Sequence, residues 1–191
     1  MKEIRIHCEG RSGLDSGMNA FLGALVKQAR AHGLRWRLIW GKSTAETRNG
    51  FEKDRRAFPA PNSLSFLLVD SEGPAPTVLR SDEFYMAQLM ESWFLADRRA
   101  LATYYGRCFR PGALPGDEQN IEIIPKADVE EGLKRATENC NRKYDKRGAK
   151  STRQANDLLT RINPQRVRGA AVNCERFFDA IERAIVNLAK S

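Results

Sequence analysis

Short apolar runs and amphipathic stretches alternate along the first half of the chain. Runs at about 4–8, 34–40 and 64–69 have the length and the β-branched or aromatic content of strands. The first two runs are each followed by a stretch with helical spacing, at about 14–32 and 42–56. This β-α-β-α-β order predicts an α/β fold with a mostly parallel sheet, right-handed crossovers and flanking helices.

Helical spacing dominates the second half of the chain. The stretch over 83–105 is expected to form one helix, or two helices broken near Asp97. Helices are predicted over 83–105, 128–140, 151–161 and 174–190, and a short strand over 120–124.

Acidic residues stand where two of the predicted strands end. Glu9 follows the run 4–8, and Asp70 and Glu72 follow the run 64–69. Ligands of open α/β sheets bind beyond the carboxyl ends of the strands, so these three carboxylates are expected to converge on one crevice. Their mutual repulsion is relieved by a hard cation such as Mg²⁺ or Mn²⁺. The pattern predicts a metal site formed by Glu9, Asp70 and Glu72.

The acidic residues also have structural interpretations. Glu9 and Asp70 can instead cap the helices that follow them, a common role at strand-to-helix turns. Glu91 and Asp97 are second-tier site candidates, because they lie six residues apart on or beside one predicted helix and do not share a face. The alternative for both is a carboxylate on a helix surface or a buried, hydrogen-bonded one.

The excess positive charge lies in one segment. The net charge is +8, and the segment from Lys134 to Arg168 holds eleven basic residues against three acidic ones, which accounts for the whole excess. A localised basic stretch is the expected footprint of a phosphate backbone, whereas a solvated helical face is the alternative. A tyrosine is interleaved with these cations at position 144. Nucleic-acid contacts are predicted for Lys143, Lys146, Arg147 and Lys150.

Composition limits the class of protein. The 191 residues are 41% hydrophobic and 29% charged, which is typical of a soluble globular chain. No apolar stretch approaches the roughly 20 residues that cross a bilayer, and no signal-peptide core follows Met1, so we expect a cytoplasmic protein without membrane segments. The four cysteines are scattered without a Cys-x-x-Cys pair, and we expect them to be reduced, mostly buried thiols.

Several sequence blocks carry a resemblance to a known family. The blocks 67–72, 86–97, 121–129, 144–146 and 158–164 resemble, in order and over nearly the full length, the bacterial domain-of-unknown-function family 4276. The most specific block is MESWFLAD at 90–97. That family looks like a compact relative of the Toprim fold, the metal-binding domain of topoisomerases, primases and related nucleases.

The resemblance implies a Toprim-like site with the strand-1 glutamate on Glu9 and the strand-3 acidic pair on Asp70 and Glu72. It also implies an ABC- or AAA-type ATPase partner, encoded nearby, in defence against phage. The chain departs from the Toprim pattern by having Asp-x-Glu in place of Asp-x-Asp after the third strand. It also has Phe84 where related sequences have a histidine.

We therefore expect one Toprim-like domain over 1–191, with the metal site in a β-α-β-α-β half (1–80) and a mainly helical, basic half (81–191). The expected function is Mg²⁺-dependent hydrolysis of DNA or RNA, with Glu9 as a further ligand or as the general base. The alternative is a non-catalytic Toprim-like module that binds nucleic acid or regulates an ATPase partner. The sequence leaves open the choice between DNA and RNA and the formation of a homo-oligomer.

Overall fold

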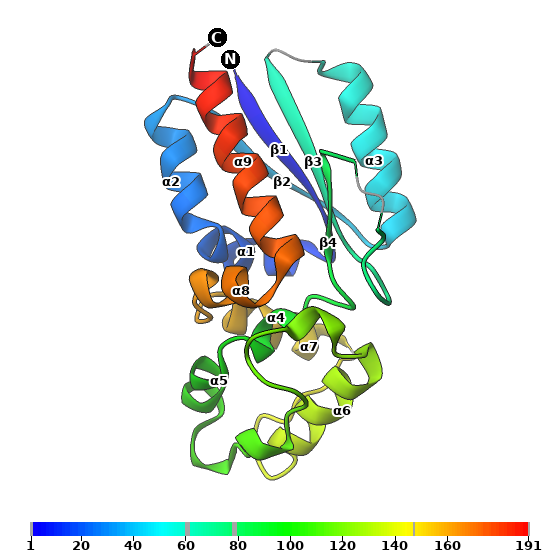
Figure 1. Cartoon of the computed structure of the whole chain (residues 1–191), viewed down its shortest axis with the longest axis vertical. Coiled ribbons are helices and arrows are strands. Elements are labelled where there is room, and N and C mark those ends of the chain that lie inside the picture. The colour runs from blue at the N-terminus through cyan, green and yellow to red at the C-terminus, as the bar shows by residue number, and fades with distance from the viewer. Residues whose placement is uncertain (1, 60–61, 78–79, 147, 191) are drawn as a thin grey trace.

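A parallel sheet forms the centre of the fold (Figure 1). The computed structural model describes residues 2–59, 62–77, 80–146 and 148–190. Within them, the strands pair in the order β2-β1-β3-β4, and every pair is parallel, so the predicted α/β fold is confirmed. The strands are β1 (Glu3–Glu9), β2 (Arg35–Gly41), β3 (Ser63–Asp70) and β4 (Glu83–Met86).

Helices cover both faces of the sheet (Figure 1). On one face, the apolar side chains of β1, β3 and β4 belong to the main hydrophobic core, together with those of α1 (Asp15–Phe21), α2 (Gly23–Ala31) and α9 (Val172–Lys190). On the other face, α3 (Thr44–Ala57) packs on a smaller apolar cluster that contains Phe51. The central strands are therefore buried on both sides, as parallel sheets require.

The remaining helices lie beyond the carboxyl ends of the strands, in the lower part of Figure 1. They occupy residues 92–170, which we call the helical part. The chain leaves the sheet after β4 and returns to it through α9, so the helical part is an insertion between these two elements. Its α-helices are α4 (Ser92–Leu95), α5 (Arg98–Tyr105), α6 (Lys126–Thr137), α7 (Gly148–Leu159) and α8 (Pro164–Ala170).

Short 3-10 turns connect several of these elements. They are η1 (Ser12–Leu14), η2 (Gly106–Cys108), η3 (Pro111–Ala113) and η4 (Ile121–Ile123). The strand predicted over 120–124 is wrong, because η4 occupies this position. Ile121 is buried there whereas Ile123 is 71% exposed, so the segment anchors one side chain and pairs with no strand of the described sheet.

The predicted helix over 83–105 is wrong at its start. Residues Glu83–Met86 form β4, whose pairing with β3 places Phe84 and Met86 in the main core and Tyr85 against the smaller cluster. This two-residue alternation is too short to stand out from the helical spacing that follows. The predicted helix over 14–32 is likewise divided, since α1 and α2 meet at Leu22.

Two of the four cysteines are joined. Cys108 and Cys140 form a disulfide across 32 positions of sequence, so the prediction of reduced thiols is wrong for this pair. Cys8 and Cys174 are free and buried. No sequence motif predicts the disulfide, because the bond forms only where η2 packs against the end of α6. At this contact, Arg110 N donates to the carbonyl of Ala136 at 2.9 Å. Among the described residues, no helix is long and apolar enough to span a bilayer.

Candidate functional site

Glu9 and Asp70 meet at the carboxyl ends of the neighbouring strands β1 and β3. The backbone N–H of Asp70 donates to Glu9 Oε2 at 3.3 Å. The hydroxyl of Thr44, at the start of α3, donates to the same oxygen at 2.7 Å. Among the described residues, Glu9 Oε1 accepts no hydrogen bond, so one oxygen is fixed and the other is left for a ligand.

The Asp70 carboxyl holds the loop between β4 and α4. Its Oδ1 accepts a hydrogen bond from the backbone N–H of Met90 at 2.9 Å. The first helical turns after β1 (η1 and α1) and the first helix after β3 (α4) begin without a side-chain cap, so Glu9 and Asp70 do not cap the helices that follow their strands. The capping interpretation therefore does not account for either acid.

Burial raises the pKa of Asp70 well above its usual value. The negative charges of Glu91 and then Glu9 raise the pKa further, while the ammonium of Lys146 opposes them. Neighbouring carboxylates thus resist ionisation of Asp70. Such a group binds either a proton or another cation more readily than an isolated aspartate does.

Glu91 contributes the third carboxylate, and we call Glu9, Asp70 and Glu91 the acidic cluster. The Glu91 side chain is buried, and Tyr144 Oη donates to its Oε1 at 3.3 Å. Burial raises its pKa, against the opposing influence of Lys146. The sequence placed Glu91 only in the second tier, although the specific MESWFLAD block around it was a signal for the site.

Lys146 is the cation that faces the acidic cluster. Its Nζ donates to Glu130 Oε1 at 2.7 Å. Burial alone would lower the pKa of Lys146, but the hydrogen bond with Glu130 and the charges of Glu91 and Asp70 raise it. The sequence predicted that Lys146 would contact nucleic acid, whereas the structure places it beside the carboxylates.

The other two acidic candidates lie apart from this cluster. The Glu72 side chain is about half exposed and forms an ion pair with Lys126, although its charge adds slightly to the raised pKa of Asp70. Asp97 caps α5 by accepting from Ala100 N at 3.1 Å, and it also accepts from Asn163 N at 3.0 Å. Asp97 is thus the buried, hydrogen-bonded carboxylate of the alternative interpretation.

Two loops beside Asp70 have strained backbones. Among the described residues, Glu72 (φ 57°) and Gln88 (φ 65°) are the non-glycine residues with positive φ. Glu72 N donates to Gln88 O and Gln88 N donates to Gly73 O, both at 3.1 Å. A left-handed residue costs roughly 1–2 kcal/mol, and such strain concentrates at functional sites. The loops after β3 and β4 are therefore held in a defined position around Asp70.

The carboxylate oxygens of Glu9 and Asp70 are the kind of ligand that a hard cation prefers. Within the described ranges, no three His, Cys, Asp or Glu side chains are arranged as a ready metal site. Mg²⁺ commonly takes only one or two protein carboxylates and keeps several waters. Glu9 and Asp70 can supply those two carboxylates, and their repulsion is the electrostatic condition that a cation relieves.

The predicted nucleic-acid residues divide into two sets. Lys143 and Lys150 line a cavity of about 650 Å³ beside α5 and α7. Lys146 faces the acidic cluster. Arg147 lies outside the described residues.

Comparisons with known proteins identify the family. No curated protein and no solved structure matches the chain. The family model described as "Domain of unknown function (DUF4276)" matches residues 15–182, a range that contains Asp70, Glu91 and Lys146 and begins after Glu9. The protein therefore belongs to the DUF4276 family.

Proposed function

We propose that this protein hydrolyses phosphodiester bonds in nucleic acid with the help of a divalent cation held at the acidic cluster. One observation carries the proposal: carboxylates from β1, β3 and the start of α4 meet around the buried Asp70, whose N–H donates to Glu9 Oε2 at 3.3 Å and whose pKa is raised by burial and then by Glu91 and Glu9. A protein retains such repulsion where a cation or a proton has to be bound.

The chemistry of the site divides among its residues. A bound divalent cation would neutralise a phosphate and stabilise the negative charge that develops during hydrolysis. Asp70, fixed by Met90 N, and the oxygen of Glu9 that Thr44 fixes would hold the cation. The unfixed Glu9 Oε1 is placed to accept a proton from water, as a general base requires.

Lys146 would neutralise part of the acidic cluster before a cation binds. Its ammonium is hydrogen-bonded to Glu130 and lowers the pKa of both Asp70 and Glu91. With a cation held by the carboxylates, the Lys146 ammonium would be able to contact a phosphate oxygen. Lys146 would thus link the occupancy of the acidic cluster to substrate contact.

The setting of the protein is part of the same proposal. The sequence resemblance implies a Toprim-like nuclease that works with an ABC- or AAA-type ATPase in phage defence, in the cytoplasm. Membership of the family and the four-stranded parallel sheet agree with the family and the α/β fold from which this setting is inferred. The Cys108–Cys140 disulfide opposes the cytoplasmic part of this setting, because disulfides are rare in cytosolic proteins, and the proposed hydrolysis does not depend on the compartment.

A cleavage assay tests the proposal. Labelled single-stranded DNA, duplex DNA and RNA are incubated with the protein in Mg²⁺, Mn²⁺ or EDTA. We expect cleavage that requires the cation and falls at least about 100-fold in Glu9→Gln, Asp70→Asn and Glu91→Gln. Glu72→Gln is the matched control, because Glu72 pairs with Lys126 at the edge of the site, and it should retain activity. Cleavage in EDTA, or undiminished cleavage by Asp70→Asn, would contradict the proposal.

A second candidate function is a non-catalytic module that binds nucleic acid or regulates an ATPase. The observation that favours it is the Lys146–Glu130 ion pair, which already places a cation beside the acidic cluster. Salt-sensitive binding without cleavage in any of the three metal conditions would support this function. The two candidates are thus separated by one set of reactions.

A further inference from the structure

Two adjoining cavities on the helical part are lined by cations. The larger, of about 650 Å³, lies between α5 and α7, and the smaller, of about 420 Å³, lies between α5 and the turn before α8. They adjoin because α5 supplies Tyr104 to the first and Thr103 to the second. Seven cations line the two cavities, and we call six of them, all but Arg166, the α5–α7 track: Arg99, Arg142, Lys143, Lys150, Arg153 and Arg161.

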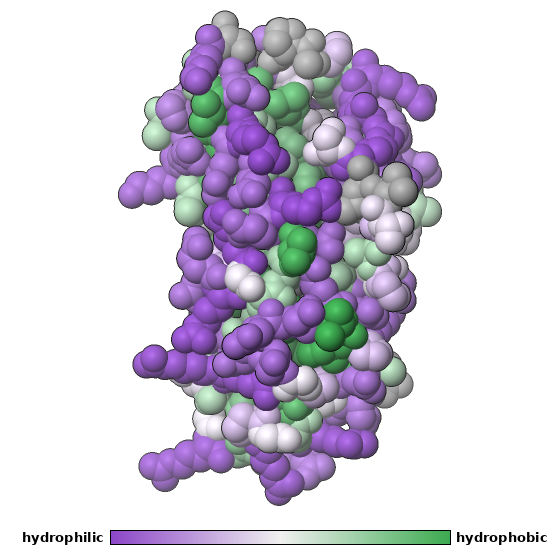
Figure 2. Space-filling view, in the orientation of Figure 1, coloured by the Kyte–Doolittle hydropathy of each residue, from purple (hydrophilic) through white to green (hydrophobic). Residues whose placement is uncertain are grey.

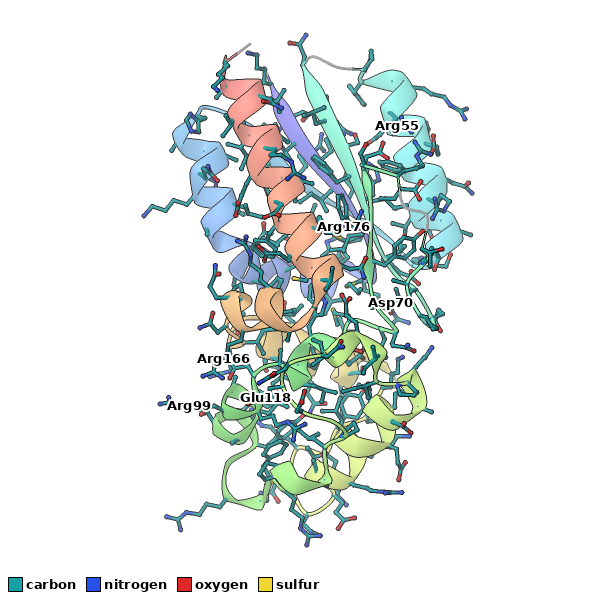
Figure 3. All side chains as sticks on the ribbon, in the orientation of Figure 1. Arg55, Asp70, Arg99, Glu118, Arg166 and Arg176 are labelled. Carbon is teal, nitrogen blue, oxygen red and sulfur yellow. A yellow bond between two sulfur atoms is a disulfide. The ribbon has the colours of Figure 1, made fainter. Side chains whose placement is uncertain are left out.

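The track cations are exposed and keep their charge for a ligand. Seven cations and three carboxylates (Asp97, Asp145 and Asp157) line the two cavities, so the lining carries a net positive charge. At the end of the smaller cavity, Arg166 lies 3.9 Å from Asp97, and Figure 3 shows Arg166 near Arg99. In contrast, Arg168, two positions further along α8, contacts Glu175 at 2.6 Å and Glu182 at 2.9 Å. The face viewed in Figure 2 is largely hydrophilic over the helical part.

Tyr104 joins the two cavities and provides a flat surface. The guanidinium carbons of Arg142 and Arg161 lie 5.7 Å and 5.6 Å from the centre of its ring. Its hydroxyl lies 3.4 Å from Asp157 Oδ2, which fixes the ring. Planar aromatic and guanidinium groups stack on unpaired bases, whereas the bases of a duplex already stack on one another. The composition of the track therefore favours a single strand.

A short segment connects the track to the acidic cluster. Lys143 lines the larger cavity, the hydroxyl of Tyr144 donates to Glu91, and Lys146 faces Asp70. Four consecutive positions therefore reach from the cationic groove to the carboxylates. A nucleic-acid strand bound along the track would therefore reach the acidic cluster.

We propose that the α5–α7 track binds the backbone of single-stranded nucleic acid. The assignment of the ligand rests on the proposed function, whereas the binding itself needs no cation and no hydrolysis. Phosphates contact the arginine and lysine side chains, and bases stack beside Tyr104. Binding of this kind weakens steeply with salt, because each neutralised phosphate releases counterions.

The test measures binding of a fluorescent 20-nucleotide single strand by anisotropy, in EDTA, over a range of salt concentrations. The triple variant Arg142→Gln, Arg153→Gln, Arg161→Gln should bind at least about tenfold more weakly, with a log–log salt slope smaller by about 2. Lys143→Gln with Lys150→Gln, which removes two exposed side chains, should weaken binding in the same direction.

A second cationic groove provides a charge-matched control. Lys27, Arg30 and Arg35 line a cavity of about 780 Å³ beside β2. Changing all three to Gln removes the same charge as the track variant and should change the affinity by less than about twofold.

Three results would overturn the proposal. The first is an equal loss of affinity in both triple variants, which would indicate that net charge alone matters. The second is no loss in either variant, and the third is equally tight binding of a duplex. If the track variant loses binding while cleavage is absent from every variant, the track proposal stands and the nuclease proposal fails. If cleavage requires Asp70 but single strands bind the track variant normally, the reverse holds.

Discussion

The backbone N–H of Asp70 lies 3.3 Å from Glu9 Oε2, so the end of β3 donates a hydrogen bond to the acid that ends β1. The two acids are therefore positioned by neighbouring strands of one sheet and not by flexible loops. A site built on strands is held more precisely than one built on loops. The predictions that follow test what this fixed arrangement does to charge, to stability and to cation binding.

Removing the charge of Asp70 should stabilise the protein at neutral pH. Its native pKa is raised by burial and by neighbouring carboxylates, so the native state binds a proton more tightly than the unfolded state does. Stability is therefore highest below the unfolded pKa and falls as the pH rises through the native pKa. Asp70→Asn should not lose this stability, so its unfolding free energy should exceed that of the wild type by about 1.4 kcal/mol for each unit by which the native pKa of Asp70 exceeds the unfolded one.

Urea unfolding of Asp70→Asn and of the wild type at pH 7.5 and at pH 4 measures this effect. The gain should be present at pH 7.5 and smaller at pH 4. Asp157→Asn, a change of the same type on α7, serves as the control. A loss of stability in Asp70→Asn at pH 7.5 would contradict the raised pKa.

A divalent cation should stabilise the wild type. A cation that binds the native state alone adds about 2.7 kcal/mol at 100 times its dissociation constant, which raises the melting temperature by roughly 5–10 °C in a chain of this size. The rise should be seen in calorimetry with Mn²⁺ or Mg²⁺ and should be absent from Asp70→Asn. An equal rise in that variant would place the cation elsewhere.

Lys146→Met should destabilise the protein at neutral pH by about 1–3 kcal/mol, because it leaves the partly buried Glu130 without its partner. The loss should shrink toward pH 4, where the carboxyls that Lys146 faces become protonated. The same variant should bind Mn²⁺ more tightly, since the ammonium no longer occupies the acidic cluster. Denaturant unfolding and cation titration measure the two effects, and Arg135→Met, which removes an exposed ion pair, is the control.

Gly17→Ala should disturb the contact between the sheet and the helical part. A Cβ at Gly17 would lie 2.5 Å from the backbone oxygen of Asn156 on α7, and Asn156 Oδ1 accepts from Gly17 N at 2.7 Å. The expected loss is about 1–3 kcal/mol of unfolding free energy. Gly23→Ala is the matched control, because no atom lies within 4 Å of its added Cβ, and it should be neutral or slightly stabilising.

The disulfide can be tested by counting thiols. Alkylation in denaturant without reductant should label two cysteines, Cys8 and Cys174, and prior reduction should allow all four to be labelled. Closing a loop across 32 positions is worth about 3–4 kcal/mol in the chain-entropy model, so Cys108→Ser with Cys140→Ser should lower stability by about that amount. Four labelled cysteines without reduction would contradict the bond.

The strands that carry the acids could be predicted because buried parallel strands have a local signature. The runs around Ile6 and Leu67 are apolar throughout and end in polar turns, so the positions of Glu9 and Asp70 followed from pattern alone. β4 could not be separated in the same way, since its four residues join a helical stretch.

The rest of the acidic cluster depends on contacts that no local pattern encodes. Glu91 joins Asp70 because Tyr144 and Lys146, more than fifty positions later, fold over it. Glu72 follows Asp70 by two residues, yet its left-handed backbone accompanies an ion pair with Lys126. Neither arrangement can be deduced from spacing, because each is set by the way the helical part packs on the sheet.

Because the helical part is inserted between β4 and α9, the charged groups around Asp70 come from two parts of the fold. Glu9 and Asp70 lie on strands of the sheet, whereas Tyr144 and Lys146 lie in the helical part and Glu91 directly precedes it. A rotation of one body against the other would change the charge around Asp70 without breaking a single bond between strands. A ligand or partner that binds the helical part could therefore change the pKa of Asp70 without contacting the acidic cluster.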